Sequence, residues 1–227
     1  MTFTRYAIYY APPADAEWSR FGASWLGWDM ETGQSLPHPA GTGLDVAAVT
    51  DVPRKYGLHA TLKPPMRLAA GQTRAALETA CTALAAAQKP VSLDGMHLAR
   101  LGRFLALRPI GDQTALNALA AACVTELDPF RATASEAELG RRRTAGLTPE
   151  QDGNLTRWGY PYVLDQFRFH ITLTGKLPKP DLPAVEDALN THLVPLLPAP
   201  FMISDLALAG EASDGKFHLI HRYALSG

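Results

Sequence analysis

The sequence predicts an α+β protein of two lobes, each a small, mainly antiparallel sheet backed by helices, with a cleft between the lobes. The pattern His-x-Thr occurs twice, at residues 59–61 and 170–172. A predicted helix and two predicted strands follow each copy in the same order. A repeat this long indicates two lobes related by a pseudo-twofold axis rather than a solenoid. Small-molecule sites often lie at such a junction, so the cleft is the expected active site.

Strand and helix signals alternate in the first half of the chain. Residues 6–10 are aromatic and β-rich and end at two prolines, and Asp15 is placed to cap a helix whose apolar residues continue to Leu26. Thr73 is placed to begin an Ala-rich helix. The remaining predictions are a loop over 33–43, a strand over 54–64 that carries His59, helices over 73–87 and 114–126, and strands over 91–99 and 104–109.

The second half repeats this order after a polar stretch. Residues 167–175 predict the strand that carries His170, followed by a helix over 182–193 and strands over 201–209 and 216–225. The stretch before it contains three consecutive arginines, 141–143, and a helix start at Thr148-Pro149. The domain prediction is therefore one bilobal unit, with lobe one at about 1–127, a connector or lid at about 128–157, and lobe two at about 158–227.

Composition limits the classes of partner. The formal net charge of -1 and the pI of about 6.6 argue against binding to long nucleic acid and favour a small substrate. The two cysteines, Cys81 and Cys123, lie in Ala-rich helical stretches and are expected to be buried and reduced, and no Cys/His cluster indicates zinc. Neither a membrane-spanning run nor a signal peptide is evident, so a cytoplasmic protein without membrane contacts is expected.

The two His-x-Thr motifs carry the chemistry. On a strand, residues two apart share a face, so His59 projects with Thr61, and His170 projects with Thr172. One neutral imidazole can accept a proton from water while an imidazolium donates one to a leaving oxygen. The threonine hydroxyls can donate to phosphoryl oxygens where charge develops. This chemistry needs no metal or other cofactor, and none is predicted.

These motifs give the chain a family resemblance. Residues 54–65 and 167–175, together with 5–10 and 158–161, resemble the two-histidine (2H) phosphoesterase superfamily, and within it a bacterial phosphonate-metabolism subfamily, nearly from end to end. The resemblance implies catalytic roles for His59 and His170 and phosphate-binding roles for the two threonines. It implies hydrolysis of a cyclic phosphodiester, and a small phosphate-ester or phosphonate-derived substrate. Leu58 stands where an aromatic residue is expected, on the face away from the site.

Neighbouring polar residues offer further contacts, each with a structural alternative. Lys63 follows Thr61 by two residues and Arg168 precedes His170 by two, so both are candidates to bind substrate, with solvated or cross-strand positions as the alternative. One face of the first strand carries Tyr6 and Tyr10 and the other carries Tyr9. Each of the three either packs against other side chains or lines the cleft.

The sequence gives two alternatives each for Tyr56 and for the arginine run. Tyr56 stays a candidate because Gly57 can break the strand. The run 141–143 is either solvated or a lid that clamps an anion.

Two other functions remain open at this point. The same side chains suit a binding module for a phosphate or phosphonate ester that performs no turnover. They also suit an RNA end-processing or 2′–5′ ligase-type enzyme, although the near-neutral charge disfavours a long RNA track. Which histidine is base and which is acid is not decided by the sequence.

Overall fold

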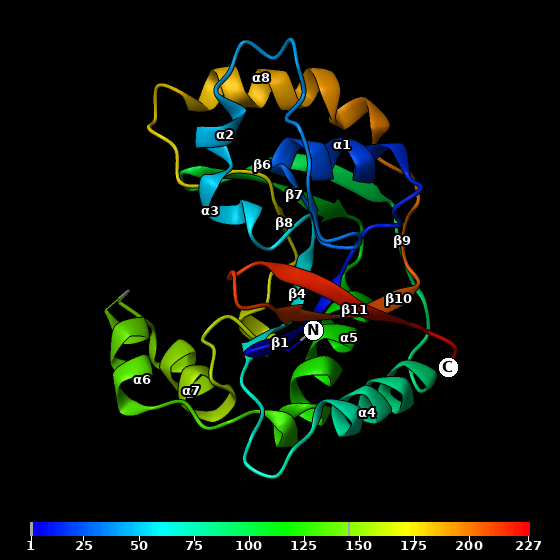
Figure 1. The fold of residues 1–227 in the computed structure, drawn as a ribbon, viewed down its shortest axis with the longest axis vertical. Helices are drawn as coiled ribbons and strands as arrows, with labels where there is room; N and C mark the ends of the chain where they lie inside the picture. Colours follow the sequence, from blue (N-terminus) through cyan, green and yellow to red (C-terminus); the bar gives the residue numbers. More distant parts are fainter. Residues whose placement is uncertain (1, 145) are drawn as a thin grey trace.

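The computed structural model describes residues 2–144 and 146–227 and confirms the α+β class (Figure 1). Seven strands form one sheet in the order β11-β10-β1-β4-β8-β7-β6, and every neighbouring pair is antiparallel. The strands are β1 (Arg5–Tyr10), β4 (Ala60–Met66), β6 (Gly95–Leu101), β7 (Phe104–Ile110), β8 (Ile171–Thr172), β10 (Asp205–Glu211) and β11 (Phe217–Ala224).

The two halves of the sequence exchange strands across this sheet. The hairpin β6–β7 pairs with β8 from the second half, whereas β10 and β11 lie beside β1 from the first half. The segments 1–127 and 158–227 therefore each contribute strands to both halves of the sheet, instead of forming one sheet each. The order of strands along the chain does not predict this exchange, because pairing between strands far apart in the sequence sets their order in the sheet.

Helices cover the sheet at both ends. Helices α4 and α5 contact strands at the β4–β10–β11 end, and α8 contacts β6 at the other end (Figure 1). Their apolar sides join one core that runs through both halves of the sheet. The helices are α1 (Glu17–Leu26), α2 (Val46–Val49), α3 (Asp51–Arg54), α4 (Arg74–Ala86), α5 (Thr114–Glu126), α6 (Glu136–Arg143), α7 (Pro149–Trp158) and α8 (Leu182–His192), with 3₁₀ turns at Asp128–Phe130, Leu164–Gln166 and Val194–Leu196.

Three strand predictions need correction. The strand expected over 54–64 is regular only from Ala60 and continues to Met66, while Arg54 ends α3. The expected strand over 91–99 is divided, because β5 (Val91–Leu93) pairs with β9 (Phe201–Ile203), while β6 begins two residues later and pairs with β7. The expected strand over 167–175 is regular only at Ile171–Thr172. A second small sheet joins β2 (Trp28–Asp29) to β3 (Gln34–Ser35). Strand β3 lies at the start of the predicted loop over 33–43.

Two of the three helix caps that the sequence predicts are formed. Thr73 and Thr148 cap α4 and α7 as predicted, each accepting a hydrogen bond from a backbone N–H. Asp15 does not cap α1, since Ala16 occupies the N-cap position and no side chain accepts there. Cys81 and Cys123 are buried and free, as expected.

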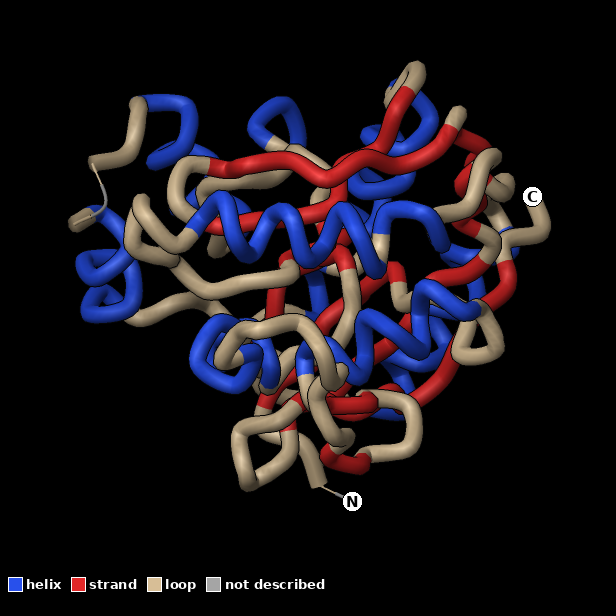
Figure 2. The backbone as a smooth tube through the Cα atoms, turned by 90° about the horizontal axis from the view of Figure 1, so that it is seen from above, coloured by secondary structure: helices blue, strands red, loops and turns tan. Residues whose placement is uncertain are grey.

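The stretch predicted as a connector or lid contains helices α6 and α7. The two helices contact each other and lie together at one side of the molecule (Figure 1), and Figure 2 shows the same edge from above. Arg143 of α6 pairs with Asp152 of α7 at 2.6 Å, which ties the helices together. In the described part of the chain, no helix has the length and apolar character needed to cross a bilayer.

Candidate active site

The two His-x-Thr motifs meet at the junction of β4 with β8. Ala60 pairs with Ile171, the central residue of each motif, in antiparallel register. In this register, the neighbours of the paired residues oppose each other, so His59 faces the Thr172 side and Thr61 faces the His170 side. The local twofold relation between the motifs therefore passes through the Ala60–Ile171 pair.

Burial alternates along both motifs as the sequence predicts. The exposed fractions of Leu58, Ala60 and Leu62 do not exceed 5%, and those of Phe169, Ile171 and Leu173 do not exceed 1%. The histidine and threonine of each motif are half-buried. Each motif thus turns one apolar face into the core and presents an imidazole and a hydroxyl on the other face.

Both imidazoles are held in the same way. Nδ1 of His59 lies 2.9 Å from the carbonyl oxygen of Gly57, and Nδ1 of His170 lies 2.8 Å from that of Arg168. A carbonyl only accepts, so each neutral ring carries its proton on Nδ1 and leaves the Nε2 lone pair free. Nε2 of His59 lies 3.3 Å from Oγ1 of Thr61. In this tautomer the Thr61 hydroxyl can donate to Nε2, so the basic nitrogen lies on the side of the motif hydroxyl.

The His59 imidazole packs against two tyrosine rings. Its ring lies 4.0 Å from the ring of Tyr9, centroid to centroid, and 5.8 Å from that of Tyr56. Burial lowers the pKa of His59 to about 4. The charge of His170 acts in the same direction, and the hydrogen bond that Nδ1 donates to the Gly57 carbonyl acts in the opposite one. His59 is consequently a neutral acceptor at neutral pH.

A pocket of about 360 Å³ opens over His59, Thr61 and Thr172. His170 lies beside it, two residues before Thr172. Two cationic side chains, Arg5 and Arg142, line the pocket, and no carboxylate lines it. Its other lining residues are Tyr9, Val52, Pro53, Tyr56, Gly57, Pro64, Pro65, Tyr160 and Thr174. This lining suits an anion that also has an apolar or ring-shaped body. Across residues 2–144 and 146–227, no three His, Cys, Asp or Glu side chains form a group that could hold a metal ion.

The buried hydroxyl of Tyr9 lacks a hydrogen-bond partner among the described residues. The side chain is 0% exposed. An unpaired buried hydroxyl costs about 1–3 kcal/mol, so such a group at a pocket wall indicates a ligand that completes it. Of the alternatives left open for the first strand, Tyr9 packs in a small hydrophobic cluster and also lines the pocket, whereas Tyr6 and Tyr10 pack in the main core.

Tyr56 reaches the pocket because of the glycine after it. Gly57 has φ of 70°, and a Cβ there would meet Cβ of Met30 at 2.9 Å. This turn interrupts strand parity, so the Tyr56 ring lines the pocket and stacks on Phe217 at 5.2 Å between centroids. The same turn sets the carbonyl that holds His59.

Lys63, predicted to bind substrate, does not line the pocket. Tyr9 pairs with Thr61, but Ile8 pairs with Lys63, so a bulge lies between these pairs in β4. A bulge adds one residue and reverses the side-chain alternation. Lys63 is therefore 2% exposed in the interior, where Nζ donates to the carbonyl of Val124 at 2.9 Å and lies 3.7 Å from Asp128.

Arg168 also lies away from the pocket lining. Its guanidinium donates to the carbonyls of Asp165 and Phe167 at 2.8 and 2.6 Å, so local backbone holds it. Only the carbonyl of Arg168 serves the site, through His170. The structure thus separates both candidate cations of the motifs from the pocket.

Other cations take their place. Arg142, from the run 141–143, lines the pocket and lies 5.0 Å from the Tyr160 ring centroid. Arg5 lines it from β1 and is held by Glu211, with Nε–Oε2 at 2.5 Å. The sequence did not single out Arg5 or Tyr160, although both lie in segments that carry the family resemblance, 5–10 and 158–161.

Residues 61–218 match the model of a family described as "Protein of unknown function (DUF1045)". The chain belongs to this family. Two curated relatives share the name ribose 1,5-bisphosphate phosphokinase PhnN. The protein from Janthinobacterium sp. (strain Marseille) is 38% identical over 94% of this chain and 49% of its own length. The one from Laribacter hongkongensis (strain HLHK9) is 35% identical over 93% and 49%. The chain spans about half the length of these relatives.

Solved structures with a similar course of the chain include LigT of Escherichia coli. Its complex with 3′-AMP gives a TM-score of 0.49 at 16% identity, and its complex with NADP+ gives 0.48 at 15%, with 100% of each chain covered in both cases. The protein TT0787 of Thermus thermophilus gives 0.45 at 17% identity, with 98% of each chain covered.

Proposed function

We propose that this protein is a phosphoesterase that opens a small cyclic phosphodiester by attack of water, without a metal ion. The main support is the symmetry of the two motifs, in which both imidazoles are anchored through Nδ1 to the carbonyl two residues earlier. Rings anchored in this way, with the lone pair on Nε2, are suited to proton transfer, because their tautomer and orientation are fixed before substrate arrives.

In the proposed reaction, His59 is the base and His170 is the acid. Burial keeps His59 neutral, which suits it to accept a proton from the attacking water. The water oxygen forms a bond to phosphorus, and the bond from phosphorus to one ring oxygen breaks. His170 donates its proton to that leaving oxygen, and the product is a phosphomonoester with a free hydroxyl. Proton exchange with solvent then resets both rings.

Three hydroxyls are proposed to bind the phosphoryl oxygens. Thr61 and Thr172 line the pocket beside the reacting centre, and the unpaired Oη of Tyr9 is available to donate there. Donors that are held in place before substrate binds stabilise the charge that develops on phosphoryl oxygens. Arg142 and Arg5 add positive charge at the rim.

The proposed substrate class is a sugar or nucleotide phosphate ester, with a place in phosphonate metabolism. The resemblance to the phosphonate-metabolism subfamily favours this class. The curated relatives also favour it, because their name describes a kinase for ribose 1,5-bisphosphate. Since this chain spans about half of those proteins, the kinase reaction is not part of the proposal.

The test is hydrolysis of a panel of cyclic phosphodiesters in EDTA, including nucleoside 2′,3′-cyclic phosphates and ribose 1,2-cyclic phosphate. The parent protein is compared with His59→Ala and His170→Ala, and with His97→Ala as a matched control, since His97 is exposed on β6. We expect turnover that survives chelation and falls by about 100-fold or more in each motif variant, with His97→Ala unchanged.

Turnover that is lost in EDTA and restored by a divalent cation would contradict the proposed mechanism. Binding of a panel member without turnover would instead support the binding module, and joining of RNA ends would support the ligase-type function.

A further inference from the structure

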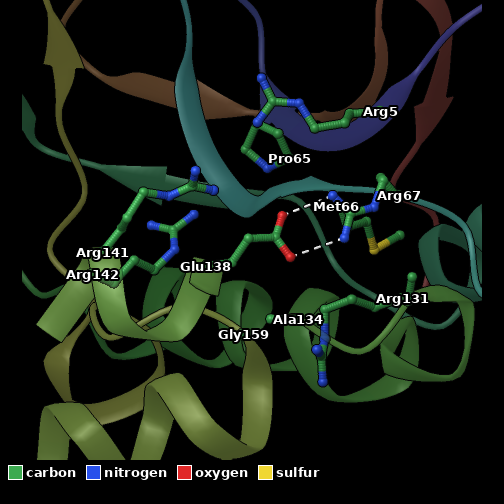
Figure 3. Close-up of a pocket in the computed structure, with 11 residues that line it drawn as sticks. Arg5, Pro65, Met66, Arg67, Arg131, Ala134, Glu138, Arg141, Arg142 and Gly159 are labelled. Atoms are coloured by element: carbon green, nitrogen blue, oxygen red, sulfur yellow. Dashed lines mark hydrogen bonds and ion pairs between the residues drawn. The ribbon is translucent and has the colours of Figure 1, made fainter. Parts of the chain in front are cut away.

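A second cavity adjoins the His–Thr pocket, between the end of β4 and helix α6 (Figure 3). Its volume is about 270 Å³, and five arginines but one carboxylate line it. The charged lining residues are Arg5, Arg67, Arg131, Arg141, Arg142 and Glu138. They come from β1, from the chain after β4, from the chain after the 3₁₀ turn at Asp128–Phe130, and from α6. The cavity is therefore built by tertiary structure and is not a single charged helix face.

Three of these arginines are paired with carboxylates. Arg67 binds both oxygens of Glu138, at 2.7 and 2.9 Å, as the dashed lines in Figure 3 show. Arg5 binds Glu211, and Arg131 binds Asp128 at 2.7 Å. The hydrogen bond with Arg67 lowers the pKa of Glu138 to about 2, which keeps that carboxylate ionised and committed to its partner.

The other two arginines have no carboxylate partner within residues 2–144 and 146–227. Neither Arg141 nor Arg142 forms an ion pair there, and the contact of Arg142 is with the Tyr160 ring. Figure 3 shows both side chains extending from α6 towards β4. Their neighbour Arg143 has its partner in Asp152, so the surplus of positive charge is confined to the cavity side of the helix.

The two cavities share part of their walls. Arg5, Pro65 and Arg142 line both. A ligand whose cyclic phosphodiester lies over the two motifs can thus extend directly into the arginine-lined cavity. A cyclic phosphodiester carries one negative charge and does not need a second set of cations, whereas a phosphomonoester carries close to two at neutral pH.

We propose that the arginine-lined cavity binds a second phosphoryl group of the substrate, a phosphate or phosphonate monoester attached to the same sugar. The substrate class is then a cyclic phosphodiester that also carries a phosphomonoester. Arg141 and Arg142 neutralise this dianion, and guanidinium groups suit its oxygens because they donate in a planar fork. This assignment refines the proposed function and rests on it.

The experiment compares matched pairs of compounds with and without the second phosphate. The pairs are ribose 1,2-cyclic phosphate with its 5-phosphorylated form, and adenosine 2′,3′-cyclic phosphate with its 5′-phosphorylated form. For the parent protein we expect kcat/KM to be roughly tenfold or more higher for the phosphorylated member of at least one pair. We expect Arg141→Gln to reduce that ratio by about the same factor, while Glu136→Gln, an exposed change on the same helix outside both cavities, preserves it.

A binding measurement separates this proposal from the proposed function. The affinity of each compound is measured by calorimetry with the His59→Ala/His170→Ala double variant, with and without Arg141→Gln. If no compound is turned over, but the phosphorylated member binds more tightly and Arg141→Gln removes the difference, the cavity is a phosphate site and the phosphodiesterase function is wrong. If turnover occurs and both members react and bind equally, the cavity proposal is overturned while the function stands.

Discussion

Ala60 lies opposite Ile171 where β4 meets β8, and this pair centres the two His-x-Thr motifs on each other. Neither residue has a polar side chain, and both are buried. Their pairing nevertheless determines which motif residues face one another, because one paired position in an antiparallel ladder fixes the partners of the residues on either side. The proposed acid and base thus depend on one cross-strand contact.

The depressed pKa of His59 predicts an unusual pH profile. A base is active when deprotonated, so with a pKa of about 4 the acidic limb of kcat/KM should lie near pH 4 instead of the ordinary histidine value of about 6.5. The check is kcat/KM across the acid range, together with NMR titration of the His59 imidazole. A His59 midpoint near that ordinary value would show that water reaches the ring more freely than the structure indicates.

The motif threonines should act through their hydroxyls. Thr61→Val and Thr172→Val keep the branched shape that suits a strand, and each should lower kcat by about 10- to 100-fold, because a donor to the phosphoryl oxygens is lost. Steady-state kinetics on the best panel substrate provides the measurement. Thr79→Val, on the exposed side of α4, serves as the control. Full activity in both motif variants would exclude the threonines from phosphoryl binding.

Tyr9→Phe should separate stability from function. Removing a buried hydroxyl that has no partner should raise the free energy of unfolding by about 1 kcal/mol. The same change should weaken turnover or ligand binding, because the proposed phosphate donor is lost. Urea denaturation and kinetics on one protein preparation test both parts. A loss of stability would mean that the hydroxyl already has a partner in the free protein.

Lys63→Met should leave catalysis within about twofold of the parent, since the side chain lies in the interior and not at the pocket. Burial lowers the pKa of Lys63 from 10.5 to about 8. Between these values the unfolded chain binds more protons, so this group makes the free energy of unfolding rise with pH. Denaturation of both proteins across that range should show the free energy of unfolding of the parent rising relative to that of the variant. A large loss of activity with an unchanged fold would show that Lys63 acts in the active site.

Local sequence was sufficient for the parts of the site that depend on strand alternation. His59 and Thr61 share a face, as do His170 and Thr172, because successive side chains on a strand point to opposite sides. The same reasoning placed the intervening apolar residues in the core, and capping chemistry located the starts of α4 and α7 at Thr73 and Thr148.

Local alternation failed where the backbone departs from a regular strand. The bulge in β4 moved Lys63 to the interior, and the turn at Gly57 brought Tyr56 to the pocket. A bulge is defined by pairing with another strand, so the residues around Lys63 carry no separate signal for it. Arg168 shows the same limit, because backbone carbonyls nearby hold its guanidinium.

The sequence by itself thus determined the α+β class, the paired motifs and the face that each presents, since these follow from contacts between residues close in the chain. Tertiary structure alone decided the exchange of strands between the halves of the sheet, the Ala60–Ile171 register, and the gathering of Arg5, Arg142 and Tyr160 at one pocket. These features depend on pairing and packing between segments far apart in the chain, which the order of residues does not encode locally.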